Sequence, residues 1–230
     1  MGGRGGSSGI GGGAGGVVQY EIKEFSKDKQ QFIINQFNKL LKEYPLGPDV
    51  PELKVVGTRE KFGLSLDMED YDVEDTLYER GIDQERYMSQ AYFDGRGELI
   101  INDTGFNKSN SIEDSIDHMN RLRKETGPQM GLFKDMAGYG GEYVAAHEYA
   151  HILARSYDMY GGQKGARELV SYWNNNKDKI ARDLGGYSTM NWNEAFAEAF
   201  AQSRYKRGQS QSSKDMMEIF NRQMKKVKRK

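Results

Sequence analysis

The sequence predicts an α+β fold in which helices pack on one face of a small β-sheet. Three observations support this prediction. Short apolar segments with strand character occur in the first half of the chain. Segments with helical periodicity dominate the second half. Hydrophobic residues make up 37% of the 230 residues, which is enough for one sizeable core.

The first sixteen residues contain ten of the 28 glycines. A segment of this composition buries too little apolar surface to offset the entropy that it loses on ordering. We therefore interpret residues 1–16 as a Gly-rich flexible tail or linker. Residues 17–230 are expected to form one folded domain.

The first predicted element after this tail is a helix. Ser26 is a suitable N-cap, and apolar residues follow it at helical spacing up to Pro45. Residues 53–56 have the apolar character of a short buried strand. Residues 67–85 contain nine acidic side chains, and we interpret them as a solvated surface segment because no calcium-loop spacing fits them.

A β-hairpin is predicted next, because Ala91–Phe93 and Glu98–Ile101 flank the turn sequence Asp-Gly-Arg-Gly. Residues 111–124 then have the periodicity of an amphipathic helix, and residues 130–133 could form a further short strand. The rest of the chain is predicted to be helical in four segments, at residues 142–157, 166–173, 192–207 and 212–228.

The composition excludes several kinds of site. The chain has no cysteine, so any zinc must be held by His, Asp or Glu. A net charge of −1 gives no overall field that would attract nucleic acid or a membrane. Five of the last six residues are Lys or Arg, which we interpret as a solvated helix end and not as a nucleic-acid site.

The sequence also limits the expected localisation. No apolar run approaches the roughly 20 residues of a membrane span. The N-terminal residues lack the apolar stretch of a signal peptide. The sequence therefore leaves three localisations open: the cytoplasm, a virion, or secretion by a non-standard route. The oligomeric state also stays open.

The main chemical motif is His147-Glu148-Tyr149-Ala150-His151. Its two histidines are four residues apart, so on a helix they share one face and can reach a single ion. Glu148 can act there as a general base without being a ligand. The alternative is a pair of helix-surface histidines. It is disfavoured because the chain has only three histidines and the residues around the motif are largely apolar.

A tetrahedral zinc site needs a third protein ligand. The remaining histidine, His118, lies in a polar segment and is interpreted as a surface residue. Glu194 and Glu198 are better candidates, because they are four residues apart in a segment otherwise rich in Ala and Phe. The alternative for this pair is a solvated acidic stripe. Beside a two-histidine site that lacks a ligand, a role at the metal is favoured.

These motifs resemble those of the gluzincin metallopeptidases, of the type formed by the anthrax lethal factor catalytic domain and the Pro-Pro endopeptidases. That family has a tyrosine seven residues before the glutamate ligand and a second glutamate four residues after it. Tyr187, Glu194 and Glu198 match this spacing, as does the gap of about forty residues after His151. The resemblance covers roughly residues 142–204. It implies a zincin-like fold, with a small mixed sheet, an active-site helix and a helical C-terminal part.

The resemblance implies three zinc ligands: His147, His151 and Glu194. Glu148 would then be the general base, and Tyr187 would donate a hydrogen bond to the oxyanion. Glu198 would orient one of the ligand histidines. The implied function is that of a zinc-dependent endopeptidase, whose protein or peptide substrate pairs with an edge strand of the sheet. Either the hairpin or residues 130–133 could provide that edge.

A second hypothesis comes from a different class of protein. Domains similar to this family occur in phage and mobile-element proteins, sometimes appended to structural proteins. The chain could therefore be a virion-associated or other structural module that keeps the zincin-like fold but does not catalyse a reaction. Glu148 and Tyr187 argue against this hypothesis, because a module without activity has no need of both. A toxin role is not implied, because no carrier-binding domain fits in this chain.

Overall fold

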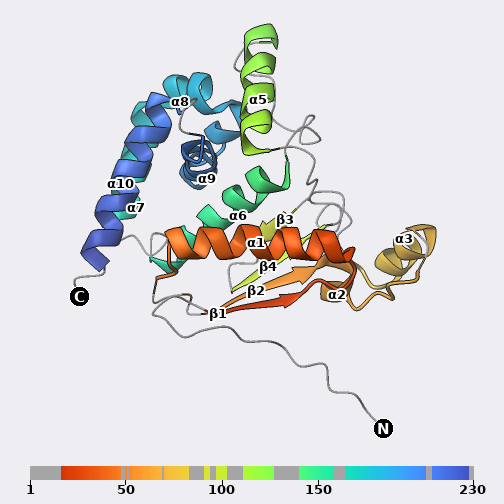
Figure 1. Cartoon of the computed structure of the whole chain (residues 1–230). Helices are drawn as coiled ribbons and strands as arrows, with labels where there is room; N and C mark the ends of the chain where they lie inside the picture. The colour runs from red at the N-terminus through yellow and green to blue at the C-terminus, as the bar shows by residue number, and fades with distance from the viewer. Residues whose placement is uncertain are drawn as a thin grey trace.

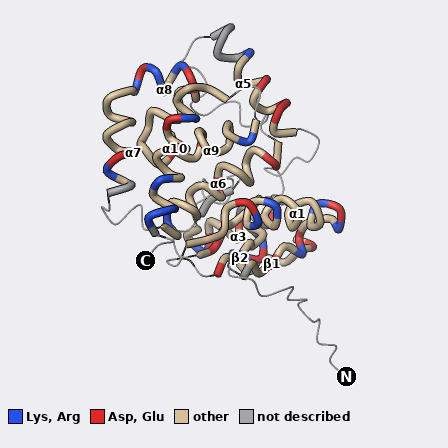
Figure 2. Tube along the Cα trace, turned by 60° about the vertical axis from the view of Figure 1, so that its left-hand side comes forward, with Lys and Arg blue, Asp and Glu red and all other residues tan. Residues whose placement is uncertain are grey.

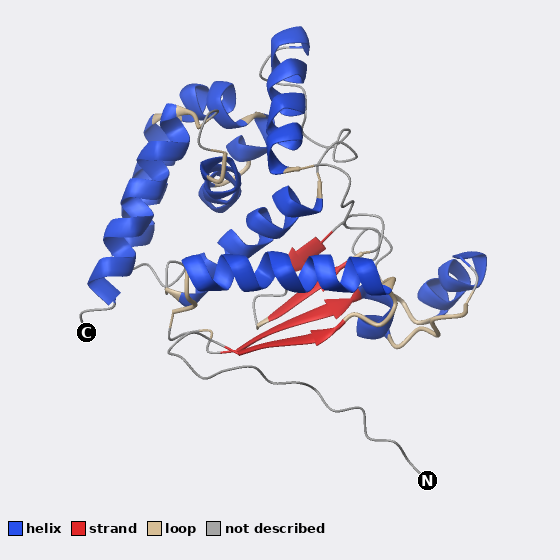
Figure 3. Ribbon diagram, viewed as in Figure 1, coloured by secondary structure: helices blue, strands red, loops and turns tan. Residues whose placement is uncertain are grey.

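The computed structural model describes residues 17–47, 50, 52–68, 70–82, 91–93, 97–102, 111–126, 140–157, 164–205 and 209–227. Within these residues the chain is mostly helical and contains one small sheet, which confirms the predicted α+β class. Figure 3 shows most of the helices on one side of the sheet, above it in this view. The predicted tail at residues 1–16 and the predicted strand at residues 130–133 lie outside the described residues.

The sheet is mixed, as expected. Its four strands are β1 (Val17–Glu21), β2 (Glu52–Gly57), β3 (Ala91–Phe93) and β4 (Glu98–Ile101). Their order is β1-β2-β4-β3. The first three strands in this order are parallel, and β3 runs antiparallel to β4. Among the described strands, β1 and β3 therefore form the two edges.

The register of the central strands places apolar side chains on both faces of the sheet. Val55 pairs with Leu99, and both belong to the main hydrophobic core. Their neighbours Val56 and Ile100 also pair with each other and are buried. Because side chains alternate along a strand, this second pair faces the opposite side of the sheet. Burial on both faces is typical of parallel strands.

Helix α1 (Lys27–Glu43) lies over one face of the sheet (Figure 1). The predicted N-cap is confirmed, because the Ser26 side chain accepts a hydrogen bond from the backbone N–H of Lys29. Ile33, Phe37 and Leu40 recur at helical spacing and are buried in the main core. The helix connects β1 to β2, and parallel strands require a crossover of this kind.

Three elements of the first half were not predicted. Strand β1 is one of them, and the others are α2 (Thr58–Phe62) and α3 (Asp70–Glu79). Helix α3 occupies the centre of the acidic segment at residues 67–85. The acidic side chains whose burial is described there, Asp67, Asp72, Asp75 and Glu79, are exposed, as expected of a solvated surface segment. Val73 and Leu77 of α3 pack with Leu64 in a small separate cluster, which gives this acidic helix a buried side. Residues 83–85 lie outside the described residues.

The second half is helical, as predicted, with ends that differ from the predictions by a few residues. Its α-helices are α5 (Ile112–Thr126), α6 (Gly141–Ser156), α7 (Lys164–Asn175), α8 (Lys177–Leu184), α9 (Trp192–Ser203) and α10 (Gln211–Val227). Helix α8 was not predicted, nor was the 3-10 helix η2 (Gly186–Thr189) that follows it. Figure 1 shows α6 on the same side of the sheet as α1, with α7 to α10 gathered beyond it.

Basic and acidic residues are interspersed along the described trace (Figure 2). On α10, Arg222 forms ion pairs with Glu168 of α7 and with Glu218 of its own helix. Lys226 also approaches Glu168, at 3.6 Å. Lys225 and Lys226 are exposed near the end of α10, as expected of a solvated helix end, and residues 228–230 lie outside the described residues. Within the described part of the chain, no helix combines the length and apolarity needed to cross a membrane.

Candidate metal centre

The candidate site lies between α6 and α9, which pack against each other near the centre of the molecule (Figure 1). Helix α6 is almost entirely buried and carries His147 and His151 one turn apart. Helix α9 carries Glu194 and Glu198 at the same spacing. The four side chains meet across the helix interface, although about forty residues separate the two motifs.

Three of these side chains converge on one point. His147 Nε2 lies 3.2 Å from His151 Nε2. Glu194 Oε2 lies 3.3 Å from the first of these nitrogens and 3.4 Å from the second. The three atoms thus form a nearly equilateral triangle, and both histidines are buried. This group could hold a metal ion.

The triangle has the dimensions that a small tetrahedral ion requires. Ligand atoms about 2.0–2.1 Å from a tetrahedral centre lie roughly 3.3–3.4 Å from one another. The observed sides of the triangle are 3.2, 3.3 and 3.4 Å. Glu194 Oε2 is also fully buried, and the two imidazole nitrogens lie within ion-pair distance of it. A buried carboxylate oxygen in this position is costly unless a cation compensates it.

Electrostatics links the imidazoles to the carboxylates. Burial alone would lower the pKa of His147. The carboxylates of Glu194, Glu198 and Glu148 raise it by more, so the pKa lies well above its usual value. Burial alone would raise the pKa of Glu194. The two neighbouring imidazoles lower it by more, so the pKa lies well below its usual range. Metal binding at Nε2 would compete with the proton that this raised pKa favours on His147.

Glu148 lies beside the triangle without belonging to it. Its side chain is buried on α6, with 8% of the residue exposed. Its negative charge contributes to the raised pKa of both His147 and Tyr187. A carboxylate in this place can accept and return a proton next to a bound metal.

Tyr187 lies near His147, on η2. Its ring centroid is 6.0 Å from that of His147. Burial raises its pKa, as do the charges of Glu194 and Glu148, so the phenol stays protonated and can donate a hydrogen bond.

The turn that carries Tyr187 is held by two features of its neighbours. Trp173 Nε1 of α7 donates a hydrogen bond to the backbone oxygen of Ser188, at 3.0 Å. Gly185, which precedes η2, has a φ of 97°, a conformation that favours glycine. The sequence signal for this turn was the Gly185-Gly186 pair.

His118 does not belong to the metal group, but its interpretation as a surface residue was wrong in part. The residue is half-buried on α5. Its Nε2 atom is buried and has no hydrogen-bond partner among the described residues. The neighbouring Ile116 is fully buried, so this part of α5 lies partly within the protein in spite of its polar sequence.

Sequence reasoning missed two residues that support the site. Asn191 caps α9, and its side-chain oxygen accepts hydrogen bonds from the backbone N–H groups of Asn193 and Glu194. Tyr143 donates a hydrogen bond from its hydroxyl to Glu198 Oε2. A signal for each was available, since Asn is a favoured N-cap and Tyr143 lies one helical turn before His147.

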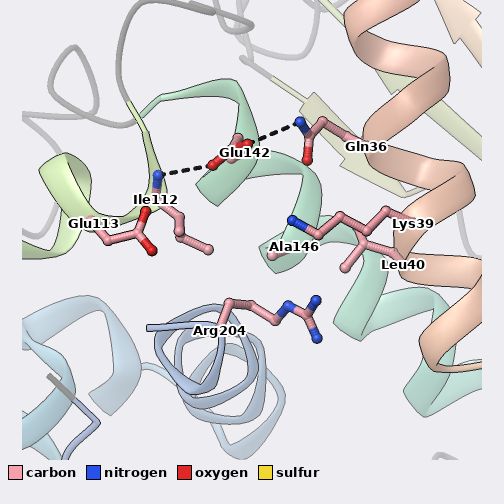
Figure 4. Close-up of a pocket in the computed structure, with 8 residues that line it drawn as sticks. All are labelled: Gln36, Lys39, Leu40, Ile112, Glu113, Glu142, Ala146 and Arg204. Atoms are coloured by element: carbon pink, nitrogen blue, oxygen red, sulfur yellow. Dashed lines mark hydrogen bonds between the residues drawn. The ribbon is translucent and has the colours of Figure 1, made fainter. Parts of the chain in front are cut away.

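A separate cavity of about 290 Å³ lies between α1, α5, α6 and the end of α9 (Figure 4). Glu142 and Ala146 line it, and they form a different stripe of α6 from the metal-facing histidines. The carboxylate of Glu142 accepts hydrogen bonds from Gln36 Nε2 and from the backbone N–H of Ile112. These bonds tie the first turn of α6 to two other helices and so help to fix the orientation of α6.

Comparison with models of known protein families gave no match to this chain. Comparisons with curated proteins and with solved structures also gave no match. The interpretation of the site therefore depends on its own geometry and chemistry.

Proposed function

We propose that this protein is a zinc-dependent endopeptidase. The proposal depends above all on the convergence of two buried imidazole nitrogens and one carboxylate oxygen, from His147, His151 and Glu194. Two histidines and a glutamate are a donor set typical of catalytic zinc, because three protein ligands leave a fourth position open. A buried carboxylate and a protonated phenol beside the same point support hydrolysis in particular.

Zinc in this site would polarise a peptide carbonyl and make a nearby water more acidic. Glu148 would take a proton from that water as its oxygen attacks the carbonyl carbon. When the C–N bond breaks, the same carboxyl group would deliver the proton to the leaving nitrogen. The effect of the Glu148 charge on the pKa of both His147 and Tyr187 supports this role.

Tyr187 would donate a hydrogen bond to the carbonyl oxygen as negative charge develops on it. This hydrogen bond would cost little reorganisation at that moment, since η2 already holds the Tyr187 ring near His147. The raised pKa supports the role, because the group stays a donor throughout the neutral pH range.

An extended peptide substrate would pair with the edge of the sheet at β3. This strand pairs only with β4 among the described strands, and it also contacts α6. A peptide added to this edge would therefore run close to the helix that carries the two histidines. This position favours the hairpin among the two predicted edges, while residues 130–133 lie outside the described residues.

Replacing Tyr187 by phenylalanine is expected to lower kcat and to change KM much less. The substitution keeps the ring that lies beside His147 and removes only the hydroxyl. Loss of one oxyanion donor typically costs about 10²–10³-fold in kcat. Steady-state kinetics on a fluorogenic peptide, with zinc content measured in parallel, would check this expectation. A wild-type kcat in Tyr187→Phe would remove the hydroxyl from the mechanism.

The proposed function can be tested with the unmodified protein. Metal analysis should find one zinc per chain. An unfolded protein substrate should be cut at internal bonds, and a zinc chelator should stop the cleavage until zinc is restored. Bound zinc without cleavage of a diverse peptide library would favour the structural-module hypothesis. Absence of bound zinc would contradict the metal centre itself.

A further inference from the structure

Five side chains alternate across the interface of α6 and α9. In order along this contact they are Tyr143, Glu198, His147, Glu194 and His151. In this order the residue numbers of α6 rise and those of α9 fall, so the two helices run antiparallel. Each helix contributes a side chain every four residues, which is one turn. The chain of contacts extends one turn beyond the metal group and ends at a tyrosine.

We propose that Tyr143 is a positioning residue for the metal centre. Its hydroxyl holds the carboxylate of Glu198, and this carboxylate fixes the orientation of the His147 ring and the nitrogen that carries its proton. The inference rests on the proposed metal site, because the role of Tyr143 is defined toward that site.

The contacts of Glu198 carry the first step of the argument. Its Oε1 atom lies 3.0 Å from His147 Nδ1, and its Oε2 atom accepts the hydrogen bond from Tyr143. Both oxygens are therefore occupied. All three side chains are buried, with exposed fractions of 2% for Tyr143, 9% for His147 and 6% for Glu198. Polar groups in such surroundings keep one arrangement, because breaking it leaves a buried group without a partner.

The second step concerns the proton of His147. A carboxylate beside Nδ1 favours the form in which Nδ1 carries the proton, and Nε2 is then left with a lone pair. Nε2 is the nitrogen that points into the triangle of donor atoms. Without the Tyr143 hydroxyl, the carboxylate would lose one of its two anchors and could rotate away from Nδ1.

The third step concerns the choice between the two glutamates of α9. Each Glu198 oxygen already has a partner, Oε2 in Tyr143 and Oε1 in His147, and neither contact lies in the triangle. Glu194 Oε2, in contrast, lies between the two imidazole nitrogens, 3.3 Å from that of His147 and 3.4 Å from that of His151. Tyr143 thus contributes to the selection of Glu194 as the ligand, by keeping Glu198 turned away from the triangle.

The test measures zinc affinity in metal-stripped protein, by competition with a chromophoric chelator. The removal of one supporting hydrogen bond in Tyr143→Phe should weaken zinc binding by about 3–10-fold, less than the 10–100-fold typical when the group that contacts the ligand is lost. In the Glu198→Ala background the same substitution should have little further effect, because the hydroxyl acts through that carboxylate. The visible spectrum of the cobalt(II)-substituted protein should also change in Tyr143→Phe.

Tyr149→Phe is a matched control. Tyr149 is also buried on α6, and its hydroxyl donates to the backbone oxygen of Tyr44 at 2.7 Å. Its loss should lower the melting temperature and leave zinc affinity and the cobalt spectrum unchanged. Wild-type zinc affinity in Tyr143→Phe, together with weaker binding in Glu198→Ala, would overturn the role of Tyr143 and leave the metal centre intact. Equal effects of both tyrosine substitutions on affinity would also overturn it. Failure of the wild-type protein to bind zinc would overturn the metal centre and this role together.

Discussion

Replacing Glu148 by glutamine is expected to abolish most peptide cleavage while the protein keeps its metal. The amide has nearly the same shape as the carboxylate but cannot take up a proton from water. General acid–base groups contribute about 10²–10⁴-fold to a rate, so kcat should fall within this range. Glu148 is not one of the three converging donors, so zinc content should match that of the wild-type protein.

Glu142→Gln provides the control for this experiment. Glu142 lies on the same helix, but its carboxylate binds Gln36 and the backbone of Ile112, away from the metal group. The same chemical change should leave cleavage close to the wild-type rate. Retained activity in Glu148→Gln would exclude Glu148 as the base. An equal loss of activity in both variants would point to a general effect of altering α6.

Replacing Glu194 by alanine is expected to remove zinc from the protein almost completely. Only two imidazoles would remain of the triangle, and two ligands rarely retain zinc at neutral pH. Glu198→Ala should weaken binding by only about 10–100-fold, because Glu198 contacts a ligand and not the proposed ion position. Binding of zinc also stabilises a fold, by about 4 kcal/mol at a thousandfold excess over Kd.

Thermal unfolding with and without zinc would distinguish these two variants. The zinc-dependent rise in melting temperature should vanish in Glu194→Ala and persist in Glu198→Ala at higher zinc concentrations. If Glu198→Ala abolished binding while Glu194→Ala retained it, the roles of the two glutamates would have to be exchanged. The metal-free melting temperatures serve as the reference for each variant.

The long helices could be predicted because each carries its own signals. Ser26 caps α1, and Ile33, Phe37 and Leu40 give it a buried stripe that the sequence alone displays. The short elements could not be predicted in this way. Helix α2 has only five residues, and the Glu24 side chain, distant in the sequence, accepts a hydrogen bond from the backbone N–H of Arg59 in it. An isolated helix of this length is unstable, so tertiary contacts determine its existence.

For the candidate site, the sequence by itself determined which side chains share a helix face. Four-residue spacing places His147 with His151 and Glu194 with Glu198, because one turn separates the members of each pair. It could not determine from spacing alone which glutamate meets both imidazoles. That choice depends on the antiparallel register of α6 and α9, in which Glu198 lies beside Tyr143 and Glu194 lies between the histidines. Only the tertiary structure decides this register, because it results from packing of the whole apolar core around both helices.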